Sequence, residues 1–182
     1  MNRKSLHPNT MTLLSAWERI STSPRPLDQR EKSTQHADII QSLFVIERKE
    51  DGIWTFRSAG DQMSSLLGRE LEEHNYLNLW TGHDRQMLTS FMMAVIESRQ
   101  PGIVRARGET LTGQRIDIEM TLAPLTSVHR YTRRVRLLGL YQPLGGADML
   151  KGRPVWRHRL TALLPPEIQS EGPQLKLVAN ND

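Results

Sequence analysis

Residues 115–122 alternate strictly between two kinds of side chain. The even positions are apolar: Ile116, Ile118, Met120 and Leu122. The odd positions are polar: Arg115, Asp117, Glu119 and Thr121. A period of two is the spacing of a β-strand that packs one face on a core and turns the other toward water. We therefore expect a sheet with one dry face and one wet face.

The segments on either side of this strand predict a mixture of strands and helices. Residues 43–47 and 53–59 are rich in branched and aromatic side chains, and the Asp51-Gly52 pair between them is a strong turn signal. These two segments should form an antiparallel hairpin. Further elements are expected as short helical turns over 61–67 and 71–80 and as strands over 103–110 and 134–141.

The best helix signal begins at Thr81, because Thr81-Gly82-His83-Asp84 resembles a capping box. Apolar residues then recur at helical spacing: Leu88, Phe91, Met92 and Val95. This helix should end near Arg99, since Pro101-Gly102 follows. The shorter helix before it should end at Gly68, which takes the left-handed conformation without steric cost.

The N-terminal part of the chain predicts an amphipathic helix over residues 10–20. Its apolar residues lie at helical spacing and are Leu13, Leu14, Trp17 and Ile20. A linker rich in proline and serine follows, and a second short helix over 33–41 should lead into the first strand.

The composition changes after residue 142, where prolines and glycines leave few adjacent apolar residues. We expect a mostly irregular and flexible tail, with one short helix over 155–164 that could dock on another surface. The chain thus divides into an N-terminal helix and linker (1–32), a central domain (33–142) and the tail (143–182).

The length of 182 residues suits one domain, and the chain has no cysteine. The lack of thiols excludes disulfides, thiolate nucleophiles, thiolate-held metals and flavin–cysteine adducts. Residues 1–9 lack the apolar core of a secretory signal, and no segment is long and apolar enough for a membrane span. We expect a cytoplasmic protein without membrane insertion.

The net charge of +4 is modest and says little about binding partners. The distribution of the charged residues along the chain is more informative than their sum.

The order of two strands, short helices, one longer helix and three strands resembles a PAS domain, a sensor fold whose five-stranded antiparallel sheet cups a helical flank. Short sequence words narrow the likeness: Trp17, Pro24-Arg25-Pro26, Phe56-Arg57-Ser58-Ala59-Gly60, Leu66-Leu67-Gly68-Arg69-Glu70-Leu71 and Leu79-Trp80. Together they resemble a single-domain PAS family of alphaproteobacteria that includes a motility and cell-cycle regulator. The likeness covers residues 17–141. It implies an α+β fold and a non-catalytic sensor in signalling that touches motility, the cell cycle or histidine kinases.

A sheet roofed by helices encloses apolar side chains that form either a plain core or a ligand pocket, and both interpretations stay open. Methionine suits an adaptable pocket. The candidates for pocket lining are Phe44, Phe56, Leu79, Trp80, Met87, Phe91, Ile118 and Met120. These residues do not identify a molecule, so any cofactor or small-molecule ligand is unknown.

The N-terminal helix carries an apolar stripe that no adjacent element is obliged to cover. A second copy of the chain could cover it, which predicts a homodimer. The candidate interface residues are Leu13, Leu14, Trp17 and Ile20. The alternative is that Trp17 folds back onto its own domain. A signalling protein is the further partner that we expect.

Four arginines form a basic patch at a loop and strand edge: Arg130, Arg133, Arg134 and Arg136. With Arg157 and Arg159 they could contact phosphates, which makes a nucleic-acid-binding regulator an alternative function. That function requires these groups to share one continuous face. Arginines at a strand edge also keep it from pairing with other sheets, so we regard nucleic acid as the weaker prediction.

A haem-binding sensor is the second alternative, since His74 or His83 in the expected helical flank could ligate iron. Their spacing, without further ligands, predicts no metal site. Glu70, Glu72 and Glu73 could exchange protons with His74 only if a pocket shifted their pKa values, and such clusters usually face solvent. The sequence contains no phosphate-binding loop or nucleophile elbow, so we expect no enzyme.

Overall fold

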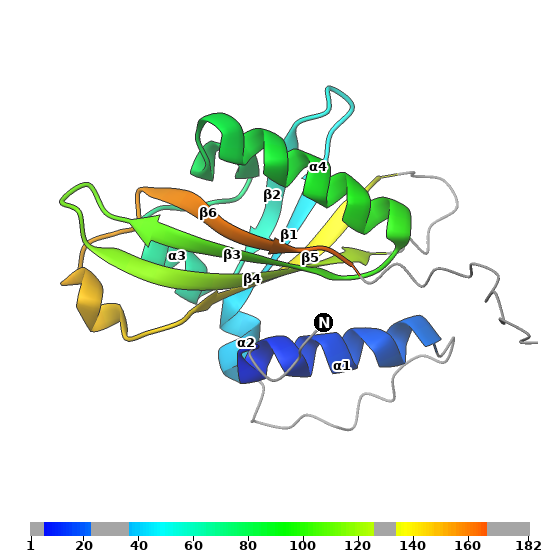
Figure 1. Cartoon of the computed structure of the whole chain (residues 1–182), viewed down its shortest axis with the longest axis horizontal. Coiled ribbons are helices and arrows are strands. Elements are labelled where there is room, and N and C mark those ends of the chain that lie inside the picture. The colour runs from blue at the N-terminus through cyan, green and yellow to red at the C-terminus, as the bar shows by residue number, and fades with distance from the viewer. Residues whose placement is uncertain (1–5, 23–36, 126–133, 167–182) are drawn as a thin grey trace, which may run out of the picture.

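A computed structural model of the chain describes residues 6–22, 37–125 and 134–166. Helices lie on both sides of one sheet (Figure 1). The helical elements are α1 (Pro8–Thr22), α2 (Ala37–Ser42), α3 (Asp61–Leu67), α4 (Gly82–Ser98) and the 3₁₀ turns η3 (Tyr76–Leu79) and η4 (Ala147–Leu150). The strands are β1 (Leu43–Arg48), β2 (Trp54–Ala59), β3 (Gly102–Glu109), β4 (Arg115–Leu125), β5 (Arg136–Pro143) and β6 (Arg157–Leu164).

The strands form one antiparallel sheet in the order β2-β1-β5-β4-β3-β6. The predicted hairpin is confirmed, with Phe44 opposite Ala59 in β1 and β2. Strand β1 also pairs with β5, which places Leu43 opposite Leu140. The expectation of an α+β fold is confirmed, but the sheet has six strands instead of the expected five.

The sixth strand comes from the segment that we expected to be an irregular tail with a short helix. It pairs with β3 from Arg157 opposite Glu109 to Leu164 opposite Ile103, with a bulge beside Ala106. The helix over 155–164 is therefore wrong, because the open edge of β3 offers backbone partners that local spacing does not reveal. The proposed domain boundaries stay a prediction.

One face of the sheet packs against α3, η3 and α4. The largest buried cluster lies there, and the four apolar residues predicted for β4 belong to it. Helix α4 contributes the residues that its spacing predicted: Leu88, Phe91, Met92 and Val95. The core of the domain is thus the layer between the sheet and these helices.

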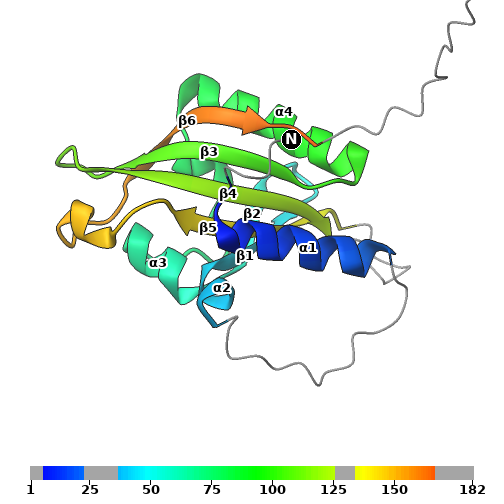
Figure 2. The same ribbon diagram turned by 60° about the horizontal axis from the view of Figure 1, so that its bottom comes forward.

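Helix α1 lies across the opposite face of the sheet (Figure 2). Its Leu14 packs with Ile103 of β3, and Leu13 packs with Leu140 of β5. As a result Glu119 and Thr121, which we expected on a wet face, are fully buried. The prediction of a wet face is wrong for this part of the sheet, because a period of two separates the faces without saying what covers them.

The ends of the helices agree with the sequence in part. Helix α3 ends at Gly68 in the left-handed conformation, with φ 63°, as expected. Thr81 precedes α4, but its side chain makes no capping hydrogen bond. Asp84 instead accepts a hydrogen bond of 3.1 Å from the backbone N–H of Leu160 in β6. The prediction of a capping box is therefore wrong, because the carboxylate of Asp84 bonds to a strand that is distant in the sequence. No helix within the described ranges is long and apolar enough to cross a membrane.

Candidate functional site

The interior between the sheet and the helices is packed with the protein's own side chains. Seven of the eight pocket candidates are at most 5% exposed and belong to the core: Phe44, Phe56, Leu79, Trp80, Phe91, Ile118 and Met120. The rings of Phe44, Phe56 and Tyr76 lie between 5.4 and 5.8 Å apart. Met87 differs, since it is 40% exposed and does not face the interior. The seven buried candidates therefore form a packed core, which is one of the two interpretations that the sequence left open.

A residue that we did not predict, His158 of β6, is fully buried beside this core. Its Nε2 lies 2.7 Å from the hydroxyl oxygen of Tyr141. The Tyr141 ring meets the imidazole edge to face at 5.7 Å, and the Trp80 ring lies 5.2 Å away. An aromatic recess therefore encloses the imidazole.

Burial controls the protonation of this group of residues. It lowers the pKa of His158 to about 4, which the backbone of Leu79 partly opposes. It also raises the pKa values of Tyr76 and Tyr141, so all three side chains are uncharged at neutral pH. Nδ1 of His158 and Nε1 of Trp80 make no hydrogen bond of normal geometry with any described residue. The Leu79 backbone nevertheless acts on the pKa of His158, and the Trp80 side chain acts on the pKa of Tyr76.

A sequence signal for His158 exists in retrospect. Arg157-His158-Arg159-Leu160 alternates with a period of two, which places the imidazole and Leu160 on one side of a strand and the two arginines on the other. The apolar residues of the same segment also lie at helical spacing, which is why the sequence predicted a helix over 155–164.

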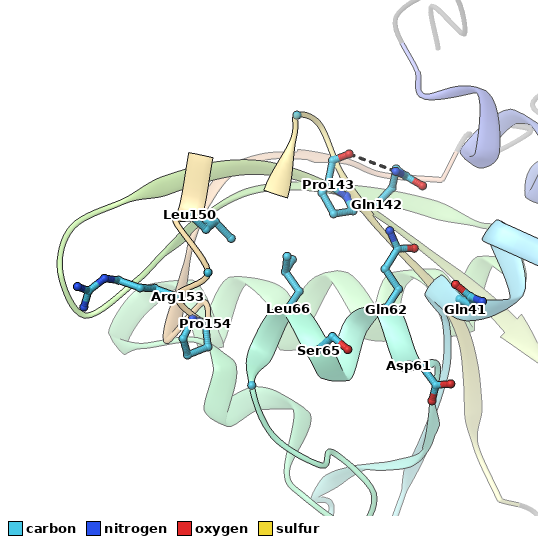
Figure 3. A pocket seen from close by; sticks show the side chains of 13 residues that line it. Gln41, Asp61, Gln62, Ser65, Leu66, Gln142, Pro143, Leu150, Arg153 and Pro154 are labelled. Carbon is cyan, nitrogen blue, oxygen red and sulfur yellow. Dashed lines mark hydrogen bonds between the residues drawn. The ribbon is translucent and has the colours of Figure 1, made fainter. Parts of the chain in front are cut away.

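A groove of about 630 Å³ lies outside the interior, between α3 and the segment that follows β5 (Figure 3). Leu66 points from α3 toward Leu150 across the groove. Gln142 at its rim accepts a hydrogen bond of 2.9 Å from Asn9 and donates one to the carbonyl of Pro143. The volume is in the range of small-molecule sites. None of the pocket candidates predicted from the sequence lines this groove.

The apolar stripe of α1, predicted as a dimer interface, packs on its own domain. Leu13 and Leu14 are 8% and 6% exposed. The indole N–H of Trp17 donates to the carbonyl of Pro124 at 3.2 Å, which is the alternative that the sequence left open. The side chain of Ile20 lies outside the described part. The described part of the stripe is therefore not an exposed surface, and the homodimer stays a prediction.

Polar contacts anchor the first turn of α1 to the sheet. The carboxylate of Glu119, which is fully buried, accepts a hydrogen bond of 2.9 Å from the backbone N–H of His7 and one of 3.0 Å from Arg105. The first backbone N–H groups of a helix lack partners within the helix, and a carboxylate near them is stabilised by the helix dipole. Docking of α1 therefore depends on a specific ionic contact as well as on apolar packing.

The basic groups within the described residues lie at two separate places on the sheet. Arg134 and Arg136 bind Glu47 at 3.0 and 2.6 Å near the start of β5. Burial tends to raise the pKa of Glu47, but the two guanidinium groups outweigh it and lower the pKa. Arg157 binds Glu109 at the opposite end of the sheet, roughly 30 Å along β4 at the usual rise per strand residue. Two members of the predicted patch lie outside the described residues: Arg130 and Arg133.

The residues considered for haem and for proton transfer lie at the surface. His74 and His83 are exposed, so neither faces the interior. Glu73 is also exposed and binds Lys49 at 2.7 Å, a hydrogen bond that lowers the pKa of its carboxyl. In the part of the chain that the structure describes, no group of three or more histidine, aspartate or glutamate side chains could hold a metal ion.

A family model of the PAS domain matches residues 5–142. The chain belongs to the PAS domain family. The matched region includes α1 and ends within β5, so β6 of this PAS domain lies beyond it. No curated protein matches the chain.

Two solved structures are similar to this PAS domain. A fungal LOV domain photoreceptor has 17% sequence identity and a TM-score of 0.46, and the match covers 79% of this chain and 99% of that chain. An RNA-binding light-oxygen-voltage receptor has 14% identity and a TM-score of 0.44, and the match covers 71% of this chain and 39% of that one. Similarity at this level concerns the fold alone.

Proposed function

We propose that this PAS domain is a non-catalytic sensor and regulatory interaction module of cytoplasmic signalling. The sequence words that resemble a family with a motility and cell-cycle regulator support a place in the control of motility, the cell cycle or histidine kinases. The observation that carries the proposal is the docking of α1, an amphipathic helix that a buried carboxylate anchors to the sheet.

In this proposal α1 has a docked state and a released state. The docked state covers Leu13 and Leu14, and release presents them to a signalling protein or to a second copy. Exchange of α1 between two copies would keep the same contacts and is therefore a low-cost route to a homodimer. A ligand or partner biases the two states only by its differential affinity for them.

A disulfide that locks α1 to the sheet tests this mechanism, and the chain has no cysteine of its own to interfere. Leu14 and Ile103 pack together, so a Leu14→Cys, Ile103→Cys variant oxidised at low protein concentration should hold α1 on its own domain. Native mass spectrometry should show dimers for the wild type and the reduced variant, and monomers for the oxidised variant after concentration.

The Leu14→Cys variant alone is the matched control, because it cannot form the intramolecular disulfide. A dimer that forms equally well with α1 locked would contradict the role of this helix. A wild-type chain that stays monomeric at every concentration would contradict the homodimer. The same spectra report any small molecule retained by the protein.

A further inference from the structure

The groove between α3 and the segment after β5 has walls that hydrogen bonds and apolar packing hold in place. The backbone N–H of Val155 donates to the carbonyl of Leu66 at 2.9 Å and joins the second wall to α3. In the preceding turn, the backbone N–H of Arg153 donates to the carbonyl of Leu150 at 3.0 Å. Leu150 belongs to the core cluster, and Leu66 packs against that cluster. The groove is therefore formed before any ligand binds, which lowers the cost of binding.

The lining of the groove changes from one end to the other (Figure 3). Beside Arg153 it is apolar, and the side chains there are Leu66, Leu150 and Pro154. Toward Asp61 the side chains are primary amides: Gln41, Gln62 and Gln142. A primary amide has two donor hydrogens and two acceptor sites, so Gln142 can bond once more in each sense beyond its contacts with Asn9 and Pro143. A peptide group, with one donor and one acceptor, matches this capacity.

Charges of opposite sign lie at the two ends of the groove. Asp61 is the first residue of α3, and a Cβ atom at Gly68, just after that helix, would lie 2.6 Å from the Cβ of Pro154, next to Arg153. The seven residues of α3 separate the two ends by about 10 Å at the usual rise of a helix. Both charged side chains are exposed, and neither has an ion-pair partner among the residues that the structure describes.

This arrangement of charges, amides and apolar side chains matches a short peptide with free ends. Three residues of extended peptide span about 10 Å, so one tripeptide can bring its ammonium group to Asp61 and its carboxylate to Arg153. The planar guanidinium group of an arginine suits a carboxylate in particular. An apolar side chain of the peptide would then lie over Leu66 and Leu150.

We propose that this groove is a site for short unblocked peptides with an apolar side chain, and that a bound peptide holds α1 in its docked state. The link is Gln142, whose amide lines the groove and accepts a hydrogen bond of 2.9 Å from Asn9 in the first turn of α1. A peptide that bonds to this amide fixes it for Asn9 and so binds the docked state more tightly than the released state. This second part rests on the proposed function, whereas the site does not.

Calorimetric titration of the full chain with the tripeptide alanyl-leucyl-alanine tests the site. The free tripeptide should bind saturably, and the same tripeptide acetylated at its amino end and amidated at its carboxyl end should bind about tenfold more weakly. The reason is that each exposed ion pair contributes up to about fivefold in affinity. Equal affinity for the two would overturn the assignment to free peptides and favour a segment of a larger protein. No saturable binding of either would overturn the site.

Variants at the two ends identify which charge recognises which end of the peptide. Asp61→Asn should weaken binding of the free tripeptide by up to about fivefold but should not weaken binding of the acetylated one, which has no ammonium group. Arg153→Gln should behave in the same way toward the amidated tripeptide. Asp51→Asn and Arg99→Gln change exposed charges that do not line the groove and are the matched controls. Variants that weaken free and blocked peptides alike would contradict recognition of the ends.

Hydrogen exchange of the full chain tests the link to α1. Saturating tripeptide should slow exchange of the amides of α1 in the wild type by about fivefold, the lower end of the usual coupling between sites. Asn9→Ala leaves the lining of the groove intact, so this variant should still bind the tripeptide but should lose the effect on α1. Unchanged or faster exchange of α1 in the wild type with bound peptide would overturn the link. These measurements do not depend on oligomer mass, so their failure can be told apart from failure of the proposed dimer.

Discussion

The buried imidazole of His158 makes folding depend on pH. Its pKa is about 4 in the folded protein and near the usual 6.5 in the unfolded chain, so the unfolded chain binds more protons between these values. Stability should therefore fall as the pH drops through this window, by about 2 kcal/mol at pH 5 relative to pH 7.5. Urea unfolding at the two pH values measures the difference.

The matched control is His158→Gln, which cannot titrate. This variant should be less stable than the wild type at pH 7.5 but should lose most of the dependence on pH above 5. Glu47 and Glu109 also have lowered pKa values, but they change stability only below about pH 4.5. They therefore do not contribute to the difference between pH 5 and pH 7.5. Equal slopes for the two proteins would show that another group is responsible.

Gly139 in β5 is a second residue whose identity the packing requires. It lies opposite Phe44, and a Cβ atom at Gly139 would come within 2.0 Å of that buried ring. Gly139→Ala should therefore overpack the core and lower the free energy of unfolding by about 1–3 kcal/mol. Gly146→Ala, at an exposed position with no atom nearer than 3.9 Å to the new Cβ, should change it by less than about 0.5 kcal/mol. Equal effects in urea unfolding would contradict this account.

At the scale of elements, the anchoring of α1 can be weakened without touching its apolar stripe. Glu119→Gln removes the charge that binds Arg105 and the N–H of His7, and should lower stability by about 1.5–3 kcal/mol. Because the lost contacts hold the first turn of α1, hydrogen exchange of Pro8–Thr22 should accelerate more than that of α4.

Asp117→Asn is the control for the anchor. Asp117 lies two residues away on the same strand and also binds an arginine of β3, but it is 58% exposed. An exposed ion pair contributes little, so this change should cost less than about 1 kcal/mol and leave the exchange of α1 unchanged. If the two variants behave alike, the ionic anchor is not what holds the helix.

At the scale of the whole molecule, a loop covers one edge of the sheet, and β6 forms the other edge. The loop after α3 pairs with the edge strand β2, where the N–H of Glu73 donates to the carbonyl of Phe56 at 2.8 Å. At the other edge β6 covers β3 and brings His158 into the interior. Without β6, strand β3 would be an open edge and a template for aggregation, so β6 protects the domain as well as completing it.

A chain that ends after Pro143 should therefore fail to form a stable monomer, although it contains the whole region matched by the PAS family. It loses the seven residue pairs between β6 and β3 and exposes the interior at Trp80 and Tyr141. A chain that ends after Pro166 keeps all the strands of the described residues and is the control. Size-exclusion chromatography and circular dichroism compare the two, and a monomeric, folded short chain would contradict this role for β6.

Local patterns in the sequence were enough for the elements whose partners lie close by. The Asp51-Gly52 turn predicted the β1–β2 hairpin, and the apolar spacing from Leu88 to Val95 predicted the buried side of α4. The alternation in β4 separated its two faces correctly. These features depend on contacts within a few residues, so spacing and turn chemistry determine them.

The candidate site depended on contacts between distant segments. His7 and Glu119, which join α1 to the sheet, are 112 residues apart, and His158 reaches Tyr141 only because β6 pairs with β3. A local pattern states that a residue lies on one side of an element but not which segment covers that side. The sequence alone thus determined the hairpin, the long helix and the two faces of the sheet. Only the tertiary structure decided that both faces are covered and that a histidine is buried between them, because burial is a property of packed segments rather than of spacing.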